Sequence, residues 1–407
     1  MEKIRVLVIS TMYPNNIDPT AGIFVHKQLT HFTEVDCQAK VICPVPYSPR
    51  ILWVRPKWKQ YAQIPQTAVI EGISVYYPRY VRLPGKWFHN TSCYTMYYGI
   101  SKIFDSIIEE FKPHILHAYR ATPDGYTGLM LKRKYNIPLV CSFEGSDIDV
   151  YPKYDRRTLC LTYRVIRGVD QTTAVSNALK AVAESITIPE REIQVIYDGC
   201  DLETFTYNEE DRLQIRKKLE ISLNEKVIIF VGHLLKDKGV FELANAFIQL
   251  NSKHSDLHLV FVGEGPEYQA LNEIIFSNGL DNKIHLVGRK LHSEIPRWMS
   301  TGDMLVLPSY HEGFPLVGIE ALACERPVVA TRVGGIPEAI DEETGILVDK
   351  EDVSSLAKGI GELIENKDKR EKMGKRGREI VEEKFTWKNS AIKLRRIYEK
   401  LIGQNPD

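Results

Sequence analysis

Two carboxylates flank a bend in the segment HEGFPLVGIEALA, residues 311–323. Glu312 stands just before a Gly-Phe-Pro turn, and Glu320 follows within the apolar run beyond it. Because Pro315 suits a first helical position, we expect a helix to begin near it and to carry Glu320 about 7 Å along its axis. The free N–H groups at a helix start suit an anion, whereas two carboxylates suit the hydroxyl groups of a diol. The apolar neighbours of Glu320 argue against the alternative, a solvated helix residue.

A second candidate site lies in IIFVGHLLKDKGVFE, where Gly232 ends an apolar run and Gly239 opens the next helix. This arrangement offers backbone N–H groups and the positive end of a helix dipole, which together suit an anion. Lys238 would add a positive charge and His233 a hydrogen-bond donor. The alternative is an ordinary turn with a solvated lysine.

Two further glycine-rich loops repeat this design. VFVGEGPE places Gly263 and Gly265 after an apolar run, although a lone G-x-G falls short of a dinucleotide fingerprint. TRVGGIPEAI places two glycines before Pro337, and Glu338 there can act simply as a favourable charge at a helix start.

The elements that must position these loops are short apolar runs alternating with amphipathic stretches. Seven runs precede residue 200: IRVLVIS, AKVICPV, ISVYYP, HILHAY, PLVCSF, QTTAVS and IQVIYD. Six follow residue 208: VIIFVG, LHLVFVG, KIHLVG, DMLVLPS, PVVAT and GILV. Continuously apolar strands are typical of parallel sheets covered on both faces, and two such blocks predict two doubly wound α/β domains. We place them at 1–200 and 208–385, with the polar segment YDGCDLETFTYNEEDR as the join and a final helix at 386–403.

Composition excludes several classes of protein. The net charge of zero gives no global field for nucleic acid, and no apolar run reaches the roughly 20 residues that span a bilayer. The seven cysteines are scattered without a C-x-x-C pair, which disfavours a disulfide framework or a zinc site. We therefore expect a soluble cytoplasmic protein.

Taken in order, these loops resemble the retaining glycosyltransferases of family 4, which have the GT-B fold. The family pattern G-R-L-x-x-x-K-G corresponds to residues 232–239, E-G-F-x-L-x-x-x-E-A to 312–321, G-G-x-P-E to 334–338 and T-G-x-L-V to 344–348. The first half matches more loosely, through MYPNNIDPTAGIFVHKQL, HILHAYRATPDGYTG, LVCSFEGSDI, VSNALK and YDGCDLETF, the last resembling N-G-V-D-x-x-x-F. The resemblance covers essentially the whole chain and includes glycosyltransferases of bacterial envelope, teichuronic acid and exopolysaccharide synthesis.

The resemblance implies two Rossmann-like domains that face a central cleft, with the acceptor bound by the first domain and a nucleotide-sugar by the second. Lys238 would contact the diphosphate, Glu320 the ribose, and Glu312 with the backbone of residues 313–316 the sugar and distal phosphate. The residues assigned to the donor are Gly22, Gly232, His233, Lys238, Gly265, Gly288, Arg289, Gly313, Phe314, Pro315, Leu316 and Glu320. Those with a catalytic role are Lys238, Glu312 and His233, and those assigned to the acceptor are His117, Tyr119, Glu144 and Asp147. The last helix would brace the first domain.

Three positions depart from the family pattern. His233 stands in place of an arginine, Tyr119 ends the usual H-x-H, and Glu144 begins the usual H-G-x-D. Each position keeps a polar side chain with altered chemistry. His117, inside an apolar strand, can instead be a core histidine with satisfied hydrogen bonds.

The implied reaction transfers a hexosyl or N-acetylhexosaminyl group, most simply from a UDP-sugar, to a sugar or lipid-linked acceptor with retention of configuration. No D-x-D stands in a suitable loop, so we expect no metal and no other cofactor; Lys238, His233 and helix N-termini would neutralise the leaving group. Two alternatives remain open: a nucleotide-sugar epimerase of the same fold, and a catalytically silent scaffold.

Residues 50–88 combine seven Lys or Arg with three of the five tryptophans and one acidic residue, Glu71. Cations interleaved with aromatic rings suit a membrane interface. We therefore expect peripheral contact with the inner face of the cell membrane. The alternative is an insertion whose aromatic rings pack on the first sheet.

Overall fold

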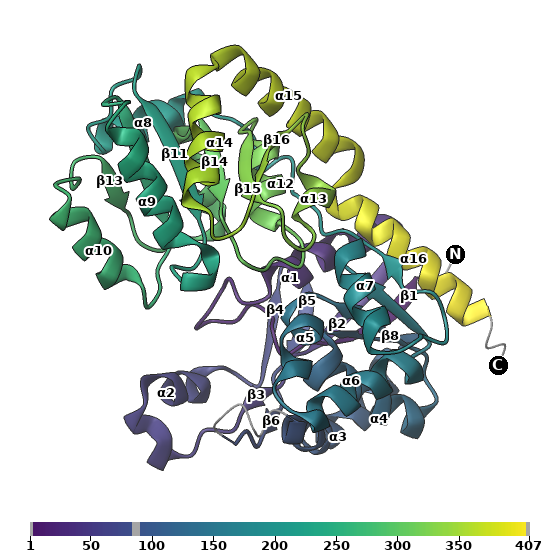
Figure 1. The fold of residues 1–407 in the computed structure, drawn as a ribbon. Helices are drawn as coiled ribbons and strands as arrows, with labels where there is room; N and C mark the ends of the chain where they lie inside the picture. Colours follow the sequence, from purple (N-terminus) through teal and green to yellow (C-terminus); the bar gives the residue numbers. More distant parts are fainter. Residues whose placement is uncertain (1–2, 84–89, 404–407) are drawn as a thin grey trace. The chain divides into compact units, whose positions relative to one another are not determined.

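The computed structural model describes residues 3–83 and 90–403, which separate into two compact units. The first comprises residues up to Asp198 together with those from Trp387 onward, and the second comprises Gly199–Thr386. The last helix of the chain, α16 (Trp387–Gly403), therefore belongs to the first unit, and the chain passes between the units twice (Figure 1).

The first unit holds an eight-stranded sheet within the described residues, in the order β10-β9-β8-β7-β1-β2-β5-β4. Its strands are β1 (Ile4–Ile9), β2 (Cys37–Ile42), β4 (Thr67–Ile70), β5 (Ile73–Tyr76), β7 (Ile115–Tyr119), β8 (Leu139–Phe143), β9 (Gln171–Ala174) and β10 (Gln194–Val195). All neighbouring strands are parallel except β4 and β5. The sequence reasoning omitted β4, and also the two-stranded sheet of β3 (Val45–Pro46) with β6 (Arg79–Tyr80).

Helices and short helical turns join these strands. They are α1 (Ile23–Thr30), η1 (His31–Val35), η2 (Arg50–Val54), α2 (Pro56–Gln63), α3 (Ser92–Phe111), η4 (Ala121–Gly125), α4 (Tyr126–Tyr135), α5 (Ser146–Asp149), η5 (Tyr151–Lys153), α6 (Arg156–Gly168) and α7 (Asn177–Ile186). Helix α16 packs against α1 and η1, and its apolar side completes the core on that face of the sheet.

The segment of η2 and α2 projects from the rest of the first unit (Figure 1) and contains no buried residue. Ile51 and Val54 are 81% and 86% exposed. Among its aromatic rings, Tyr61 packs against the core of the first unit and Trp58 packs edge-on against Tyr61 at 6.0 Å, whereas Trp53 is 38% exposed. The alternative, in which the aromatic rings pack on the first sheet, therefore holds for Tyr61 and not for Trp53.

The second unit holds a six-stranded sheet, counted over the described residues, in the order β13-β12-β11-β14-β15-β16. Its strands are β11 (Lys226–Val231), β12 (Leu257–Val262), β13 (Ile284–Leu286), β14 (Met304–Leu307), β15 (Val328–Thr331) and β16 (Gly345–Val348). All pairs are parallel, so the strands end at one edge of the sheet. The order reverses between β11 and β14, which makes the loops after these strands the topological switch point where doubly wound sheets bind ligands.

The helices of the second unit cover its sheet with apolar faces. They are α8 (Glu209–Lys218), η6 (Lys236–Lys238), α9 (Val240–Asn251), α10 (Tyr268–Ser277), η7 (His292–Glu294), α11 (Ile295–Thr301), α12 (Leu316–Ala323), α13 (Ile336–Ala339), α14 (Val353–Glu365) and α15 (Lys367–Lys384). Helices α9 and α14 pack on each other and share the core with strands β11 and β12. The prediction of two doubly wound α/β domains is confirmed.

Candidate functional site

Lys238 and Glu312 meet at the switch point of the second sheet. Lys238 ends the short turn η6 after β11, and Glu312 lies in the loop after β14. The Lys238 Nζ is 2.7 Å from the Glu312 Oε2, and both side chains are partly exposed. The two loops are also joined by the backbone, since the N–H of Tyr310 donates to the carbonyl of Asp237 at 2.8 Å. Two residues that the sequence assigned separately thus form one charged pair at the ligand-binding edge.

Gly239 explains why the two loops can approach so closely. Its φ of 69° is left-handed, and a Cβ there would lie 2.0 Å from the carbonyl oxygen of Pro308. Only glycine accommodates both conditions without strain. Gly239 thus allows the loop that carries Lys238 to pack directly against the loop after β14.

His233 lies five residues before Lys238 on the same loop after β11, and its side chain is exposed. The loops after β12 and β13 end at the same edge of the sheet, where Arg289 lies 3.3 Å from Glu264. Gly265 packs directly on the carbonyl of Leu234, and Gly288 has a left-handed φ of 73°. The fold therefore brings every residue predicted for the donor in this unit to one edge of the sheet.

Helix α12 begins one residue later than expected, with Pro315 as its N-cap. Phe314 is buried and packs on Phe385 with ring centroids 5.5 Å apart, which anchors the turn. The carbonyl of Glu312 accepts from the N–H of Gly335 at 3.1 Å, so the loop after β15 holds the turn in place. The start of α12 is therefore held by Phe385 on one side and by the loop after β15 on the other.

Glu320 lies on the buried side of α12, with 5% of its surface exposed. Its Oε1 is 2.7 Å from the Nε2 of His292, and the His292 ring packs against Phe205 at 5.2 Å. The solvated alternative for Glu320 is therefore wrong. Sequence reasoning missed His292 because nothing in its neighbourhood points to a carboxylate 28 positions later.

In the first unit, the switch point lies between β1 and β7 and is occupied by Thr11, Arg120 and Asp124. The Asp124 carboxylate accepts from the Thr11 N–H at 2.6 Å and from the Thr11 hydroxyl at 3.0 Å. The Arg120 guanidinium donates to the same hydroxyl and lies 3.6 Å from Asp124. Burial raises the pKa of Asp124 to about 6, and Arg120 opposes that rise. None of the three was predicted, although Arg120 and Asp124 directly follow a strand of the sheet.

Three of the four residues predicted for the acceptor, His117, Tyr119 and Asp147, have buried side chains that bond to other parts of the first unit. His117 is fully buried, with Nδ1 2.6 Å from the Tyr398 hydroxyl and Nε2 2.8 Å from the Ser142 hydroxyl. Its burial lowers its pKa to about 3, so the ring is neutral. The alternative, a core histidine with satisfied hydrogen bonds, is therefore the correct one.

Tyr119 and Asp147 are likewise occupied inside the unit. The Tyr119 hydroxyl donates to Gln28, whose amide donates to Ser390 of α16 at 2.6 Å. The Asp147 carboxylate accepts from the backbone N–H groups of Ala121, Glu144 and Gly145 at 2.7, 3.1 and 2.9 Å. The Asp147 carboxylate thus joins the loops after β7 and β8, and the Tyr119 hydroxyl links β7 to Gln28 of α1.

Glu144 remains as a candidate acceptor residue, together with Asp198, which sequence reasoning missed. Burial raises the pKa of Glu144 well above its usual value, and the neighbouring carboxylates of Asp198 and Asp147 raise it further. Burial also raises the pKa of Asp198 to about 7. Asp198 stands where the N-G-V-D motif has asparagine, and Glu144 stands where the H-G-x-D motif has histidine. The two departures from the family pattern therefore lie close enough to influence each other's pKa.

Gly22 precedes α1 with a left-handed φ of 58°, and a Cβ there would lie 2.2 Å from the carbonyl oxygen of Met12. Its own loop therefore requires glycine at this position, whether or not a ligand is bound.

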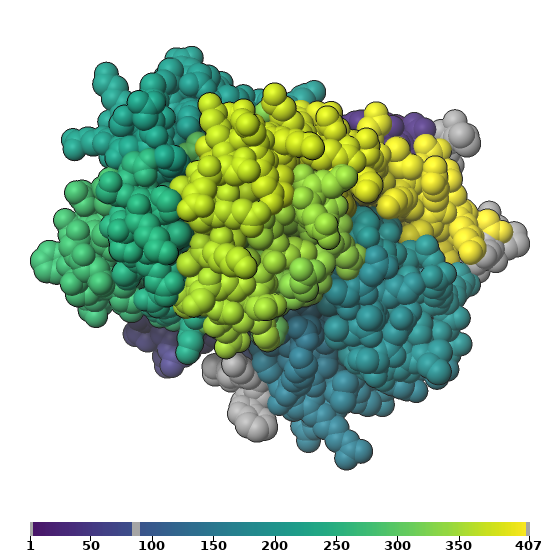
Figure 2. Space-filling model, turned by 45° about the horizontal axis from the view of Figure 1, so that its top comes forward, coloured from purple at the N-terminus to yellow at the C-terminus, as the bar shows by residue number. Residues whose placement is uncertain are grey.

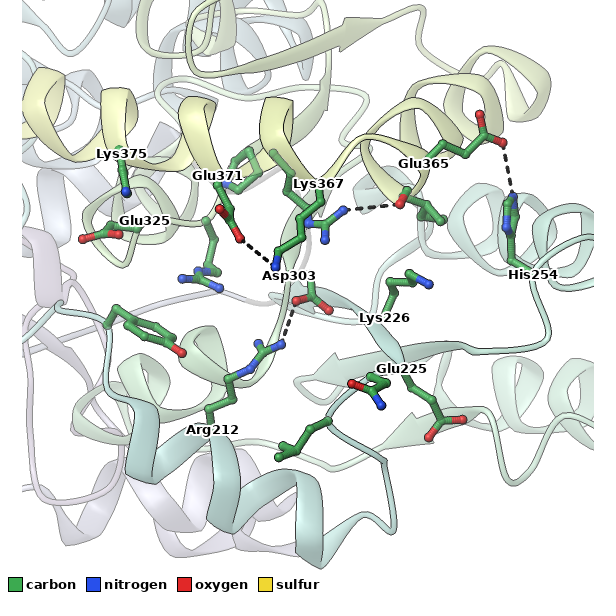
Figure 3. Close-up of a pocket in the computed structure, with 17 residues that line it drawn as sticks. Arg212, Glu225, Lys226, His254, Asp303, Glu325, Glu365, Lys367, Glu371 and Lys375 are labelled. Carbon is green, nitrogen blue, oxygen red and sulfur yellow. Dashed lines mark hydrogen bonds and ion pairs between the residues drawn. The ribbon is translucent and has the colours of Figure 1, made fainter.

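A cavity of about 810 Å³ lies elsewhere in the second unit (Figure 3). It opens beside Lys226 and Asp303, at the amino ends of β11 and β14. Its charged groups pair with one another: Arg212 with Asp303 at 2.8 Å, and Lys367 with Glu371 at 3.5 Å. Ion pairs between lining residues thus occur in this cavity, which lies at the opposite end of the strands from Lys238.

Comparison with known proteins agrees with this geometry. The description "Glycosyltransferase Family 4" matches residues 25–204, and "Glycosyl transferases group 1" matches residues 211–380. An uncharacterized glycosyltransferase of Methanocaldococcus jannaschii is 32% identical over 320 residues, covering 77% of this chain and 84% of that one. The chain belongs to glycosyltransferase family 4.

Two other similarities extend this result. The putative teichuronic acid biosynthesis glycosyltransferase TuaC of Bacillus subtilis (strain 168) is 29% identical over 366 residues, covering 88% of each chain. The structure of Anabaena HepE in complex with UDP aligns with a TM-score of 0.76 at 18% identity, over 98% of this glycosyltransferase and 100% of HepE. The predicted family and GT-B fold are confirmed.

No helix in residues 3–83 and 90–403 of this glycosyltransferase is both long and apolar enough to cross a membrane. Across the same described ranges, no three His, Cys, Asp or Glu side chains gather in a way that could hold a metal ion.

Proposed function

We propose that this glycosyltransferase transfers a hexosyl or N-acetylhexosaminyl group from a UDP-sugar to an acceptor in envelope or extracellular polysaccharide synthesis, with retention of configuration. The observation that carries the proposal is the Lys238–Glu312 pair at the switch point of the second sheet. Support for the nucleotide comes from the UDP complex of HepE, and support for the pathway comes from the name of TuaC.

In this proposal the leaving diphosphate is stabilised by fixed charges. Lys238 and the exposed His233 face the phosphates together with the N–H groups at the start of α12, and such preorganised groups favour the transition state. Glu320 accepts from the ribose hydroxyls through the carboxylate oxygen that His292 leaves free. Glu312 and the backbone of residues 313–316 hold the sugar. We propose that no metal ion takes part.

The acceptor is proposed to bind in the first unit near Glu144 and Arg120. We also propose that the protein reaches a lipid-linked acceptor at the inner membrane surface through η2 and α2, whose exposed Ile51 and Val54 lie among basic residues. Trp87, which belongs to the same prediction, lies outside the described residues. Co-sedimentation with anionic and neutral vesicles tests this contact: changing Trp53, Trp58 and Trp87 to Ser should reduce binding, and equal binding would contradict it.

The function itself is tested by measuring thermal shifts of the full chain with UDP-, GDP- and ADP-sugars, with and without EDTA. Stabilisation by UDP-sugars that Lys238→Ala abolishes is the expected result. Acceptor-independent epimer formation would instead indicate an epimerase, and no stabilisation by any nucleotide-sugar would indicate a silent scaffold.

A further inference from the structure

A groove of about 370 Å³ lies in the first unit between the edge strand β10 and helix α16. Figure 2 shows α16, in bright yellow, at the surface of the molecule. Ile196 and Leu401, both buried, contribute to the apolar part of the groove. Its volume falls within the range of small-molecule sites, about 300–1,000 Å³.

Every charged side chain that lines this groove is positive. Lys393, Arg396 and Lys400 lie on one face of α16, and Arg191 comes from the segment just before β10. Spacings of three and four residues place helical side chains in one row, so the three cations of α16 face the groove together. Like charges at such spacing destabilise a helix in the absence of a counter-charge.

These cations are not neutralised by the protein. Within residues 3–83 and 90–403, Arg191, Arg396 and Lys400 have no ion-pair partner. Lys393 lies 5.5 Å from the ring of Tyr197. The acids next to these cations in the chain pair with other residues: Glu190 with Arg167, Glu192 with Lys180 at 2.8 Å, and Glu399 with Arg395 at 2.9 Å.

The cavity in the second unit provides a contrast. There cations and carboxylates line the same space, and some of them pair with each other, as the dashed lines between Arg212 and Asp303 and between Lys367 and Glu371 mark in Figure 3. The groove between β10 and α16 differs, because its four cations are exposed and no carboxylate lies among its lining residues. A bound anion would therefore be attracted by all four charges.

We propose that the groove between β10 and α16 binds a phosphate-bearing ligand. Guanidinium groups bind phosphate oxygens in pairs, and lysines add charge without fixed geometry. The apolar residues would cover the non-polar part of the ligand. A soluble phosphate ester and a phospholipid headgroup offer the same phosphate. The site is separate from the proposed donor site, because all its residues belong to the first unit.

Inorganic pyrophosphate titrated into the full chain by calorimetry tests the proposal. Arg396→Gln should weaken one binding event by about tenfold, the equivalent of one charge-assisted hydrogen bond of about 1.4 kcal/mol. The matched control is Lys388→Gln, an exposed cation on α16 that pairs with Glu34 instead of lining the groove. Binding should also weaken as salt is raised from about 50 to about 300 mM.

Lys238→Ala separates this site from the donor site. The proposal requires that this variant still binds pyrophosphate in a manner sensitive to Arg396→Gln. If Lys238→Ala removes all binding, or if Arg396→Gln binds as tightly as Lys388→Gln, the groove is not a phosphate site.

Vesicles of phosphatidylglycerol and of phosphatidylcholine then identify the source of the phosphate. Binding to the anionic vesicles that Arg396→Gln weakens and pyrophosphate displaces supports a lipid headgroup. Pyrophosphate binding without such vesicle binding supports a soluble phosphate ester. Unchanged thermal unfolding of Arg396→Gln would show that the exposed side chain is not needed for folding.

Discussion

The ammonium group of Lys238 lies 2.7 Å from a carboxylate oxygen of Glu312, across the point where the strand order of the second sheet reverses. The pair holds the lysine in place before a ligand arrives, because its partner comes from the neighbouring loop. In the proposed donor complex, an entering diphosphate would meet this ammonium group beside the Glu312 carboxylate.

Lys238→Ala should therefore lower kcat by about 10²-fold, which is the cost of removing one preorganised group from a developing charge. Lys236→Ala is the matched control, since Lys236 starts the same turn but points to solvent. Steady-state kinetics with a UDP-sugar measures both. Near wild-type turnover of Lys238→Ala would mean that the KDKG loop is only a surface turn.

His233→Arg should be tolerated because His233 is exposed on its loop. A guanidinium donates to phosphate oxygens in pairs and is always charged. The variant should therefore keep or gain affinity for a UDP-sugar, measured as the donor KM. Loss of donor affinity in this variant would remove the proposed phosphate role.

Glu320→Gln should raise the donor KM more than it lowers kcat, because hydrogen bonds to the ribose stabilise the ground state and the transition state equally. His292→Ala should act in the same direction, since His292 orients the Glu320 carboxylate. Exposed Asp281→Asn serves as a control for the loss of one acid. A collapse of kcat at unchanged KM would contradict the ribose assignment.

Asp198→Asn should change how stability depends on pH. Burial raises the pKa of Asp198 to about 7, so the folded protein binds a proton more tightly than the unfolded chain. The resulting stabilisation is complete at acidic pH, below the ordinary aspartate pKa, and is lost as pH rises toward about 7. The stability of Asp198→Asn relative to wild type should therefore increase between pH 5 and 8, measured by urea unfolding. A difference independent of pH would contradict this environment for Asp198.

Tyr398→Phe should destabilise the first unit by about 1–3 kcal/mol, because it leaves a nitrogen of the buried His117 without its partner. The acceptor KM should not change, since the His117 ring is fully buried and both its nitrogens are hydrogen-bonded within the unit. Urea unfolding and steady-state kinetics separate the two effects. An altered acceptor KM at unchanged stability would return His117 to the acceptor site.

The fold could be predicted because apolar runs such as residues 227–232 and 257–263 are continuous, which is typical of strands buried on both faces. The donor loops could be predicted because parallel strands end at one edge, so Lys238 and Glu312 had to lie near each other. The direct ion pair between Lys238 and Glu312 could not be predicted, because it depends on the conformations of two loops.

The acceptor residues show where sequence reasoning ends. A polar residue in an apolar strand is either a ligand or a buried hydrogen-bonding group, and the choice depends on distant partners. His117 is satisfied by Tyr398, which is 281 positions away, and Asp124 is satisfied by Thr11, 113 positions away. No local pattern marks such pairs.

The place of α16 in the first unit has a consequence for synthesis on the ribosome. Residues 199–386 are inserted between two pieces of the first unit, so they emerge and can fold before Trp387 is made. Until then, His117 and Gln28 lack Tyr398 and Ser390, their hydrogen-bond partners on α16. The half of the protein translated first is thus the half completed last, and a nascent chain stalled before residue 387 would expose the face that α16 covers.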